Sequence, residues 1–200
     1  MKIPRLEPAT TIFLLCDVQE RFASVIHRFS SVVTGSQRMV TTANELGVPL
    51  FVTEQYPKGL GHTVPELDLA AAKAAGTVFE KTLFSMATPE LLSKLEIVSP
   101  SATDAVIFGL EAHVCVQQTV FDLLTKRNLN VHLCVDAISS QQPVDRACGL
   151  HRAERAGAYL TTTESVMMEL IRGKDHEKFK AISGALKTSK YDPAEALPYP

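Results

Sequence analysis

The stretch from Ala105 to Leu124, AVIFGLEAHVCVQQTVFDLL, decides the fold of this chain. It opens with four apolar residues, Ala105 to Phe108, a run typical of a strand that is buried on both faces. Gly109 interrupts the run, and after Cys115 the apolar residues recur at helical spacing as far as Leu124. The pattern therefore predicts a strand followed by a helix, with Cys115 where the helix begins.

The position of Cys115 allows two interpretations. Unpaired backbone N–H groups and the positive end of the helix dipole favour a thiolate at a helix start. The same N–H groups are suited to holding an oxyanion during acyl transfer. Free cysteines are, however, among the most buried residue types, and a lone one is most often a small core residue. At this point both the reactive and the structural role of Cys115 stay open.

Apolar runs elsewhere in the chain predict five further strands, separated by helical patterns. Strands that are apolar throughout and alternate with helices are typical of a parallel sheet covered on both faces. We therefore predict a three-layer, doubly wound α/β fold in one domain, residues 1–200, with a core over about 8–170. The further strands are Thr11–Val18, Val48–Thr53, Thr77–Glu80, Leu129–Val135 and Ala158–Thr161. The predicted helices include 22–46 (as one piece or two), 65–75, 143–156, one that Thr163 caps, and a last one at 175–187, before a proline-containing tail that ends at residue 200.

Composition narrows the class of protein. A hydrophobic content of 46% suits a full core, and a net charge of -2 without tryptophan argues against nucleic acid or an anionic membrane surface as partner. The four cysteines show no CxxC pair and no zinc spacing, and we interpret Cys16, Cys134 and Cys148 as structural. We expect no metal, no cofactor, no membrane and an intracellular location in the cytoplasm; the short N-terminus leaves a mitochondrial location open.

Polar residues follow three of the predicted strands. Asp17 comes after the first, Lys81 after the third and Cys115 after the fourth. If these strands are neighbours in a doubly wound sheet, the three side chains meet at its carboxyl edge. A carboxylate beside a thiol can take its proton, and a nearby ammonium favours the thiolate. On position alone, Asp17 is equally suited to capping the next helix.

Three motifs carry a family resemblance: FLLCDVQERF at 13–22, FEKTLFSM at 79–86 and FGLEAHVCVQQTVFDLL at 108–124. In this order and spacing they resemble the isochorismatase-like cysteine hydrolase family, in particular its isochorismatase-domain-containing proteins. The resemblance covers about residues 8–170 and includes a TEQYPxGLG-type loop at 53–61. It implies a parallel sheet of about six strands in the order 3-2-1-4-5-6 and a catalytic triad of Asp17, Lys81 and Cys115.

The resemblance also implies finer features of the site. A cis peptide bond is expected between Leu110 and Glu111, with the backbone amides of Glu111 and Cys115 as oxyanion hole. We expect His113 to point away from the site, and a homo-oligomer, either a dimer or a tetramer. Candidate substrate-binding residues, for which loop packing is the alternative, are Phe22, Gln55, Tyr56 and Phe84.

Departures from the family pattern narrow the expected activity. Thr53 to Tyr56 lacks the metal-binding Asp-x-His segment of the family's nicotinamidases, and true isochorismatases tend to lack a cysteine at the position of Cys115. We therefore expect metal-independent hydrolysis of an amide, imide or carbamoyl C–N bond in a small molecule, through a thioester. A non-catalytic metabolite-binding or interaction protein on the same fold is the alternative. A nuclease is disfavoured, because paired metal ligands and a basic groove are not evident.

Overall fold

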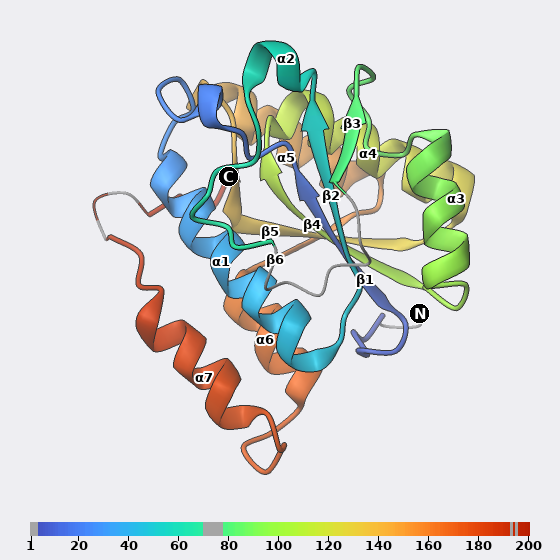
Figure 1. The fold of residues 1–200 in the computed structure, drawn as a ribbon, viewed down its shortest axis with the longest axis vertical. Coiled ribbons are helices and arrows are strands. Elements are labelled where there is room, and N and C mark those ends of the chain that lie inside the picture. The colour runs from blue at the N-terminus through green and yellow to red at the C-terminus, as the bar shows by residue number, and fades with distance from the viewer. Residues whose placement is uncertain (1–3, 70–77, 193, 195) are drawn as a thin grey trace.

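The computed structural model of the protein describes residues 4–69, 78–192, 194 and 196–200, and six of its strands form one parallel sheet (Figure 1). Their order is β3-β2-β1-β4-β5-β6, which confirms the predicted order and fold class. The chain therefore reverses its direction of winding between β1 and β4, where doubly wound sheets place their sites. The strands are β1 (Thr11–Cys16), β2 (Leu50–Gln55), β3 (Val78–Lys81), β4 (Asp104–Leu110), β5 (Asn130–Ser139) and β6 (Tyr159–Thr161).

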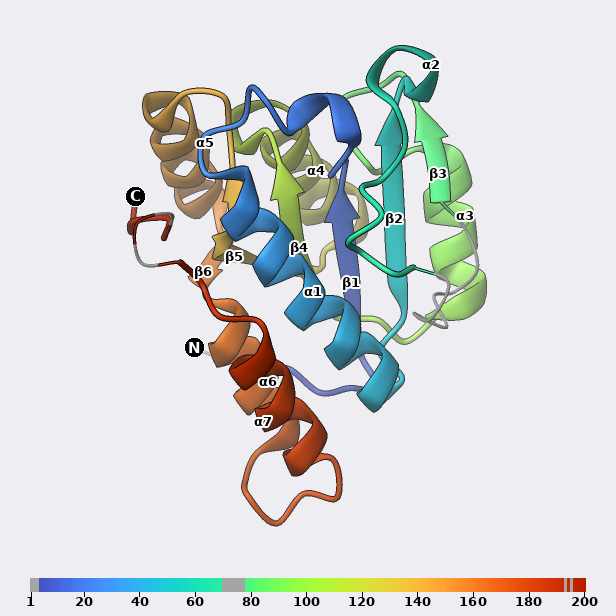
Figure 2. The same ribbon diagram turned by 60° about the vertical axis from the view of Figure 1, so that its left-hand side comes forward.

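Helices lie on both sides of the sheet (Figures 1 and 2). On one side are α1 (Phe29–Leu46), α6 (Thr163–Ile171) and α7 (Phe179–Thr188), and on the other are α3 (Pro89–Val98), α4 (Gln117–Asp122) and α5 (Pro143–Ala156). In β1, Phe13 and Leu15 belong to the buried cluster of the first side, whereas Ile12, Leu14 and Cys16 belong to that of the second. Because successive side chains of a strand point to opposite faces, burial of both faces requires the continuous apolar runs of the sequence.

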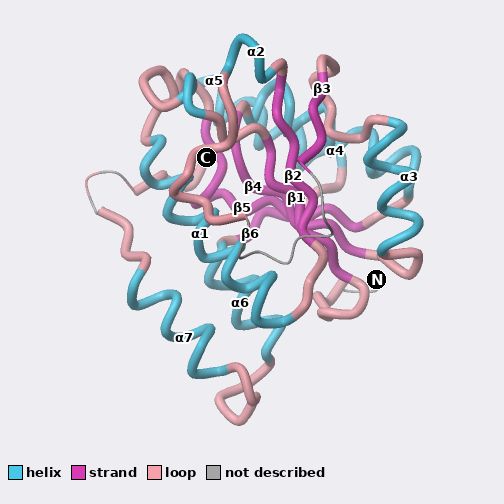
Figure 3. The backbone as a smooth tube through the Cα atoms, viewed as in Figure 1, coloured by secondary structure: helices cyan, strands magenta, loops and turns pink. Residues whose placement is uncertain are grey.

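The carboxyl ends of the central strands lie at one edge of the sheet, beside α2 (Pro57–Leu60) and the 3-10 turn η1 (Glu20–Phe22). In the tube drawing of Figure 3, helix α2 lies at this edge, beyond the end of β2. Parallel strands that are joined by crossovers all end on the same edge. This arrangement brings the residues that follow β1, β3 and β4 near one another.

Several predicted helices differ from the observed ones. Of the predicted helix 22–46, only α1 from Phe29 to Leu46 is helical, because residues 23–28 form turns after η1, and the last helix starts at Phe179 rather than at 175. The N-cap of α6 is Thr162, whose hydroxyl accepts the N–H of Ser165 (3.2 Å), because Thr163 is engaged by Asp136 instead. Of the predicted helix 65–75, residues 65–69 do not form a helix and residues 70–75 lie outside the described residues.

The chain after α7 returns along the molecule towards β6 and α5 (Figure 2). Arg28 donates a hydrogen bond to the carbonyl of Ala196, and Arg146 donates one to the carbonyl of Pro198 (2.9 Å). The proline-containing tail is thus an arm that is held by arginine side chains. Within the part of the chain that the structure describes, no helix combines the length and apolarity needed to cross a membrane.

Candidate active site

The close approach of β4 to β1 depends on Gly109. Its φ is +129°, and a Cβ atom at this residue would lie 2.2 Å from the carbonyl oxygen of Cys16 and 2.8 Å from its nitrogen. The pairing of β4 with β5 also shifts register between Ile107 and Gly109. Only glycine tolerates this backbone conformation and contact without displacement, so Gly109 lets the end of β4 lie directly beside the end of β1.

The turn after β4 is made by Glu111 in the left-handed region (φ 60°). The peptide between Leu110 and Glu111 is trans, so the expected cis bond is wrong: the positive φ of Glu111 makes the turn instead. The carbonyl of Glu111 accepts the N–H groups of Val114 (3.0 Å) and Val116 (3.2 Å). The chain therefore enters its helix before Cys115, which lies within the first turn rather than at its start.

That first turn is the π-helical segment η2 (Ala112–Val116), which continues into α4 and the second π-helical segment η3 (Leu123–Arg127). Helix α5 packs against the backbone of η2 through Gly149, where a Cβ atom would lie 2.5 Å from the nitrogen of His113. Any larger residue at this position would push the two helices apart. The position of Cys115 is thus fixed by two contacts: the approach of β4 to β1 and the packing of α5 against η2.

Lys81, the last residue of β3, is buried at the centre of the site with its side chain fully covered. Its Nζ donates to Oδ2 of Asp17 (2.7 Å), to Oε1 of Gln55 (2.8 Å) and to the carbonyl of Phe84 (2.9 Å). The carbonyl of Leu83 (3.2 Å) is a fourth oxygen acceptor, so the three protons of the ammonium meet more acceptors than they can fill. The ammonium is therefore fixed in place, with the Sγ atom of Cys115 at 3.9 Å.

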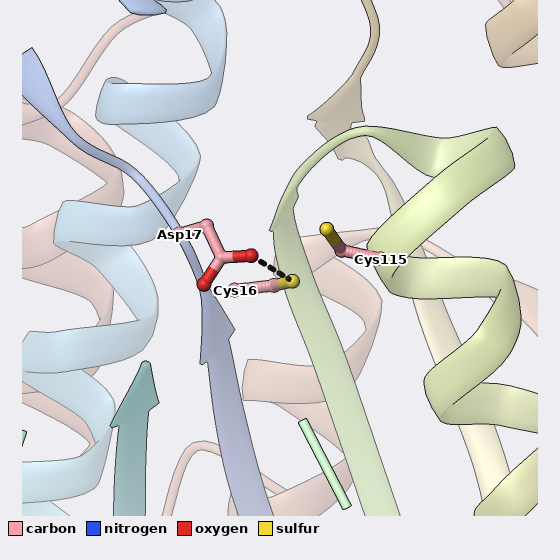
Figure 4. Close-up of side chains that lie close together, drawn as sticks. All are labelled: Cys16, Asp17 and Cys115. Carbon is pink, nitrogen blue, oxygen red and sulfur yellow. Dashed lines mark hydrogen bonds between the residues drawn. The ribbon is translucent and has the colours of Figure 1, made fainter. Parts of the chain in front are cut away.

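Asp17 follows β1 directly and has a left-handed backbone (φ 52°). Its Oδ1 accepts the hydroxyl of Thr53 (2.7 Å), and its Oδ2 accepts Lys81. One carboxylate oxygen and the sulfur atoms of Cys16 and Cys115 all lie within 4.8 Å of one another (Figure 4). The structure thus brings together the three residues that the strand ends predicted, and adds a fourth, Cys16.

Cys16, interpreted from the sequence as structural, lies inside the site, where its thiol donates to Oδ2 of Asp17 (3.6 Å). Two signals in the sequence point to this placement. Cys16 directly precedes Asp17, and the alternation of β1 sends its side chain to the face covered by the helix that carries Cys115. The family resemblance implies a triad of Asp17, Lys81 and Cys115, and this triad does not include Cys16.

Charges within the site shift two pKa values. Burial alone would lower the pKa of Lys81, but the neighbouring Cys16, Asp17 and Cys115 outweigh it, and the pKa is raised above its ordinary value. Burial, followed by the contacts with Cys115 and Asp17, raises the pKa of the Cys16 thiol well above its ordinary value. At neutral pH the site therefore holds a permanent ammonium and a protonated Cys16.

Cys16, Asp17 and Cys115 have the donor types and the spacing for a metal ion. The ammonium of Lys81 lies 2.7 Å from Asp17 and 3.9 Å from Cys115, however, and supplies the positive charge that a cation would bring. Two cations so close together would repel each other strongly in a buried site. The chemistry of this donor set thus suits a thiol nucleophile better than a metal centre.

A pocket of about 950 Å³ opens above Cys115, whose residual exposure is 5%. The four predicted substrate-binding residues, Phe22, Gln55, Tyr56 and Phe84, all line it. Leu60 and Val114 add apolar surface to the lining. Its polar residues include Glu111, His113, Gln141, Gln142 and Asp145.

His113 lines the pocket, contrary to the expectation that it points elsewhere. Its Nδ1 lies 3.2 Å from the hydroxyl of Ser140 and 3.4 Å from Oε2 of Glu111. The other oxygen of Glu111 accepts the side-chain amide of Gln141 (3.1 Å), while Oε2 of Glu111 has no hydrogen-bond donor among the described residues. Two carboxylates, Glu111 and Asp145, therefore belong to the lining, and no lysine or arginine of the described residues lines the pocket.

The loop that carries Tyr56 and Leu60 is held to the sheet by Glu54. The carboxylate accepts the N–H (2.6 Å) and the hydroxyl (2.8 Å) of Thr63 and contacts Nδ1 of His62 (2.9 Å). Burial would raise the pKa of Glu54, but these contacts outweigh it and lower that pKa, while Glu54 raises the pKa of His62. Glu54 is thus a structural anchor for one side of the pocket.

Comparison with known proteins agrees with this architecture. The isochorismatase domain matches residues 11–165. Isochorismatase domain-containing protein 1 of Danio rerio is 47% identical over 92% of this chain and 63% of its own length. Isochorismatase family protein 1B of Dictyostelium discoideum is 41% identical over 94% of this chain and 91% of its own. This chain thus spans less than two thirds of the length of the zebrafish relative.

Among solved structures, that of the MAR1 ribonuclease from Caenorhabditis elegans superposes with a TM-score of 0.87 and 44% identity. The match covers 94% of this chain and 95% of that one. The sheet order, the placement of Asp17, Lys81 and Cys115, and these similarities point the same way. The chain belongs to the isochorismatase family.

Proposed function

We propose that the protein is a metal-independent cysteine hydrolase that cleaves an amide, imide or carbamoyl C–N bond of a small molecule through a thioester on Cys115. One observation carries this proposal: the buried Lys81 ammonium lies 2.7 Å from Asp17 and 3.9 Å from the sulfur of Cys115, the residue through which this cluster reaches the pocket. A base, a nucleophile and a fixed positive charge are the groups that acyl transfer to sulfur requires.

In the proposed reaction Asp17 takes the proton of Cys115 as the sulfur attacks the substrate carbonyl. The hydroxyl of Thr53 holds one oxygen of the carboxylate, which leaves the other to exchange protons beside Lys81. Asp17 then gives the proton to the departing nitrogen as the C–N bond breaks. In the second half, Asp17 takes a proton from water, whose oxygen attacks the thioester and releases the acid and the Cys115 thiol.

The ammonium of Lys81 balances the negative charge of Asp17 and of the developing thiolate throughout. Its three protons are shared among Asp17, Gln55 and the carbonyls of Leu83 and Phe84, so it acts as a fixed charge and not as a proton donor. We propose that the backbone amides of Glu111 and Cys115 receive the oxyanion. One such donor typically contributes about 3 kcal/mol to the transition state.

The walls of the pocket favour a neutral or cationic substrate with an apolar part. Phe22, Tyr56 and Phe84 offer aromatic surface, and Glu111 and Asp145 add carboxylates to the lining. A negatively charged substrate would face these carboxylates without a free cation among the described lining residues. Small aromatic or aliphatic amides without a carboxylate are therefore the first compounds to test.

The test is a screen of such amides for released ammonia or amine, with intact-mass detection of the acyl-enzyme after an acid quench. Cys115→Ala should abolish both signals. Cys134→Ala removes another buried cysteine, outside the pocket, and should preserve both. Turnover that persists in Cys115→Ala would refute the thioester mechanism. If the wild type turned over none of the amides screened, the non-catalytic alternative would be favoured.

Ribonuclease activity is a second candidate, because a solved structure that is 44% identical carries that name. The two carboxylates on the pocket wall oppose binding of a phosphodiester, which relies on basic side chains. The assay is degradation of a labelled single-stranded RNA by the purified protein. RNA cleavage that disappears in both Cys115→Ala and Asp17→Asn would place this activity in the same site and would replace the amidase proposal.

The expected homo-oligomer, a dimer or a tetramer, remains a prediction. Leu83, Phe84 and Tyr56 are large apolar residues exposed near the mouth of the pocket, where a second copy would cover them. Light scattering coupled to size-exclusion chromatography measures the mass directly. A monomer at all concentrations would contradict the prediction.

A further inference from the structure

Cys16 has no part in the proposed hydrolysis, yet its thiol lies inside the site. It is the last residue of β1, has no exposed surface, and donates its S–H to Oδ2 of Asp17 (3.6 Å). Its sulfur lies within 4.8 Å of the sulfur of Cys115 (Figure 4). Cysteines this close in a site that has no disulfide form a potential redox pair.

The two thiols differ in their surroundings. Cys115 lines the open pocket, so solutes reach it, and the ammonium of Lys81 lies 3.9 Å from its sulfur. Cys16 lies behind it, and burial keeps its thiol protonated by raising its pKa. One sulfur is therefore placed to meet an oxidant, and the other to react with the product of that first step.

From this arrangement we infer that Cys115 and Cys16 form a peroxide-oxidation site, in which Cys115 is oxidised first and Cys16 then closes a disulfide with it. The inference requires a reactive Cys115 that can be reached through the pocket, and it does not require the protein to hydrolyse amides.

In the first step, the thiolate of Cys115 attacks one oxygen of hydrogen peroxide, the O–O bond breaks, and hydroxide leaves. The product is a sulfenic acid, in which the sulfur has been oxidised by two electrons. Asp17 accepts the proton of Cys16, whose sulfur attacks the sulfur of Cys115. An S–S bond forms, the S–O bond breaks, and hydroxide leaves and takes up a proton. Overall, two thiols and one hydrogen peroxide yield one disulfide and two waters.

Closure of the bond requires the sulfurs to approach from within 4.8 Å to about 2 Å, a movement of less than about 3 Å. The disulfide removes the nucleophile from the pocket and is reversed by a thiol reductant. Without Cys16, the sulfenic acid of Cys115 would remain open to further peroxide and proceed to sulfinic and sulfonic acids, which ordinary thiols do not reduce. Cys16 thus protects the nucleophile.

The experiment treats the purified protein with hydrogen peroxide and maps its peptides by mass spectrometry without reduction. The wild type should yield a Cys16–Cys115 crosslinked peptide. A Cys148→Ser variant, which lacks the exposed cysteine, should yield the same peptide, so that crosslinks between molecules are excluded. Cys134→Ser, which removes another fully buried thiol, is the matched control and should also retain the crosslink.

Reversibility separates the two fates of Cys115. After dithiothreitol, the wild type should recover most of its iodoacetamide-reactive Cys115, whereas Cys16→Ser should recover roughly tenfold less, with two or three oxygens on Cys115. Should Cys16→Ser fail to fold, the wild-type peptide map still decides. Oxidised Cys115 without a crosslink to Cys16, or equal recovery in the wild type and the variant, would overturn the inference, whatever the result of the amide screen.

Discussion

Asp17 and Asp136 are two acids that the sequence places alike, each at the end of a predicted apolar strand, and the structure gives them different surroundings. Asp17 shares its oxygens among Thr53, the Lys81 ammonium and a thiol, beside a pocket. Among the described residues, the hydrogen bonds to Asp136 come from neutral donors: the N–H of Thr163 (2.8 Å), the hydroxyl of Thr163 (2.7 Å) and the hydroxyl of Tyr191 (2.9 Å). The partners of an acid, rather than its place in the chain, separate a reactive role from a structural one.

The role of Asp136 is to hold three elements together. It joins β5 to the start of α6 through Thr163, and to the arm that follows α7 through Tyr191. Arg38 of α1 stacks over the ring of Tyr191 (4.2 Å to the centroid) and donates to the carbonyl of Ser189 (2.6 Å). The acid therefore stabilises the packing of the C-terminal segment, and it lies outside the lining of the pocket.

The largest expected effect comes from changing each acid to its amide. Asp17→Asn should lower kcat for the amide identified in the screen by about 10²–10⁴-fold, because an amide does not accept the proton of Cys115. Asp136→Asn makes the same chemical change at the other acid and should leave kcat within about twofold. Steady-state kinetics measures both, with circular dichroism as the control for folding. Equal losses of kcat in the two variants would contradict the assignment of a catalytic role to Asp17 and a structural role to Asp136.

The next largest effect is on stability, and here the change at Asp136 is the one that matters. Asp136→Ala leaves the buried donors of Thr163 and Tyr191 without their acceptor, and should lower the free energy of unfolding by about 2–3 kcal/mol. Urea denaturation of the wild type and the variant gives this value. A variant as stable as the wild type would show that water replaces the carboxylate at little cost.

A smaller effect appears at alkaline pH. Burial and, after it, the charge of Asp136 raise the pKa of Tyr191 above its ordinary value. The unfolded phenol ionises near pH 10 while the folded one keeps its proton, so this contribution is complete below about pH 10 and is lost above it, by at most about 1.4 kcal/mol per pH unit.

Tyr191→Phe should therefore flatten the decline of the unfolding free energy between pH 10 and 11. Part of the slope should remain, because the raised pKa of Lys81 acts in the same direction above its own ordinary value. Urea midpoints at several pH values give the slope. An unchanged slope in Tyr191→Phe would contradict the assignment.

The smallest effect concerns the loop that borders the pocket. Glu54 raises the pKa of His62 above its ordinary value of 6.5. The ion pair between them is therefore complete below pH 6.5, and it is lost as the pH rises through the pKa of His62 in the folded protein. His62→Gln should raise KM by about twofold at pH 6 and leave it unchanged at pH 8, with kcat constant at both. An effect that is larger at pH 8 would show that the charge of His62 does not hold the loop.

The sequence predicts the fold well because apolar runs and glycine stops are local signals, and the family motifs place Asp17, Lys81 and Cys115 together. Prediction from the sequence fails for contacts between segments that are far apart in the chain and come together only in the folded protein. The carbonyl of Phe84 on Lys81, and the arm that brings Tyr191 to Asp136, have no local signature. The trans turn at Glu111 likewise has no local signature, because a positive φ is uncommon for a residue other than glycine.

The central claim is that Asp17 and Lys81 activate Cys115, and its most direct test is alkylation by iodoacetamide at pH 7, followed at each cysteine by peptide mass spectrometry. Exposed Cys148 serves as the internal reference for an ordinary thiol. We predict that Cys115 reacts at least about tenfold faster than Cys148 although it is far less exposed, and that Asp17→Asn and Lys81→Met abolish this advantage while Asp136→Asn preserves it. If Cys115, accessible through its pocket, reacted no faster than Cys148 in the wild type, the claim of an activated nucleophile would be contradicted.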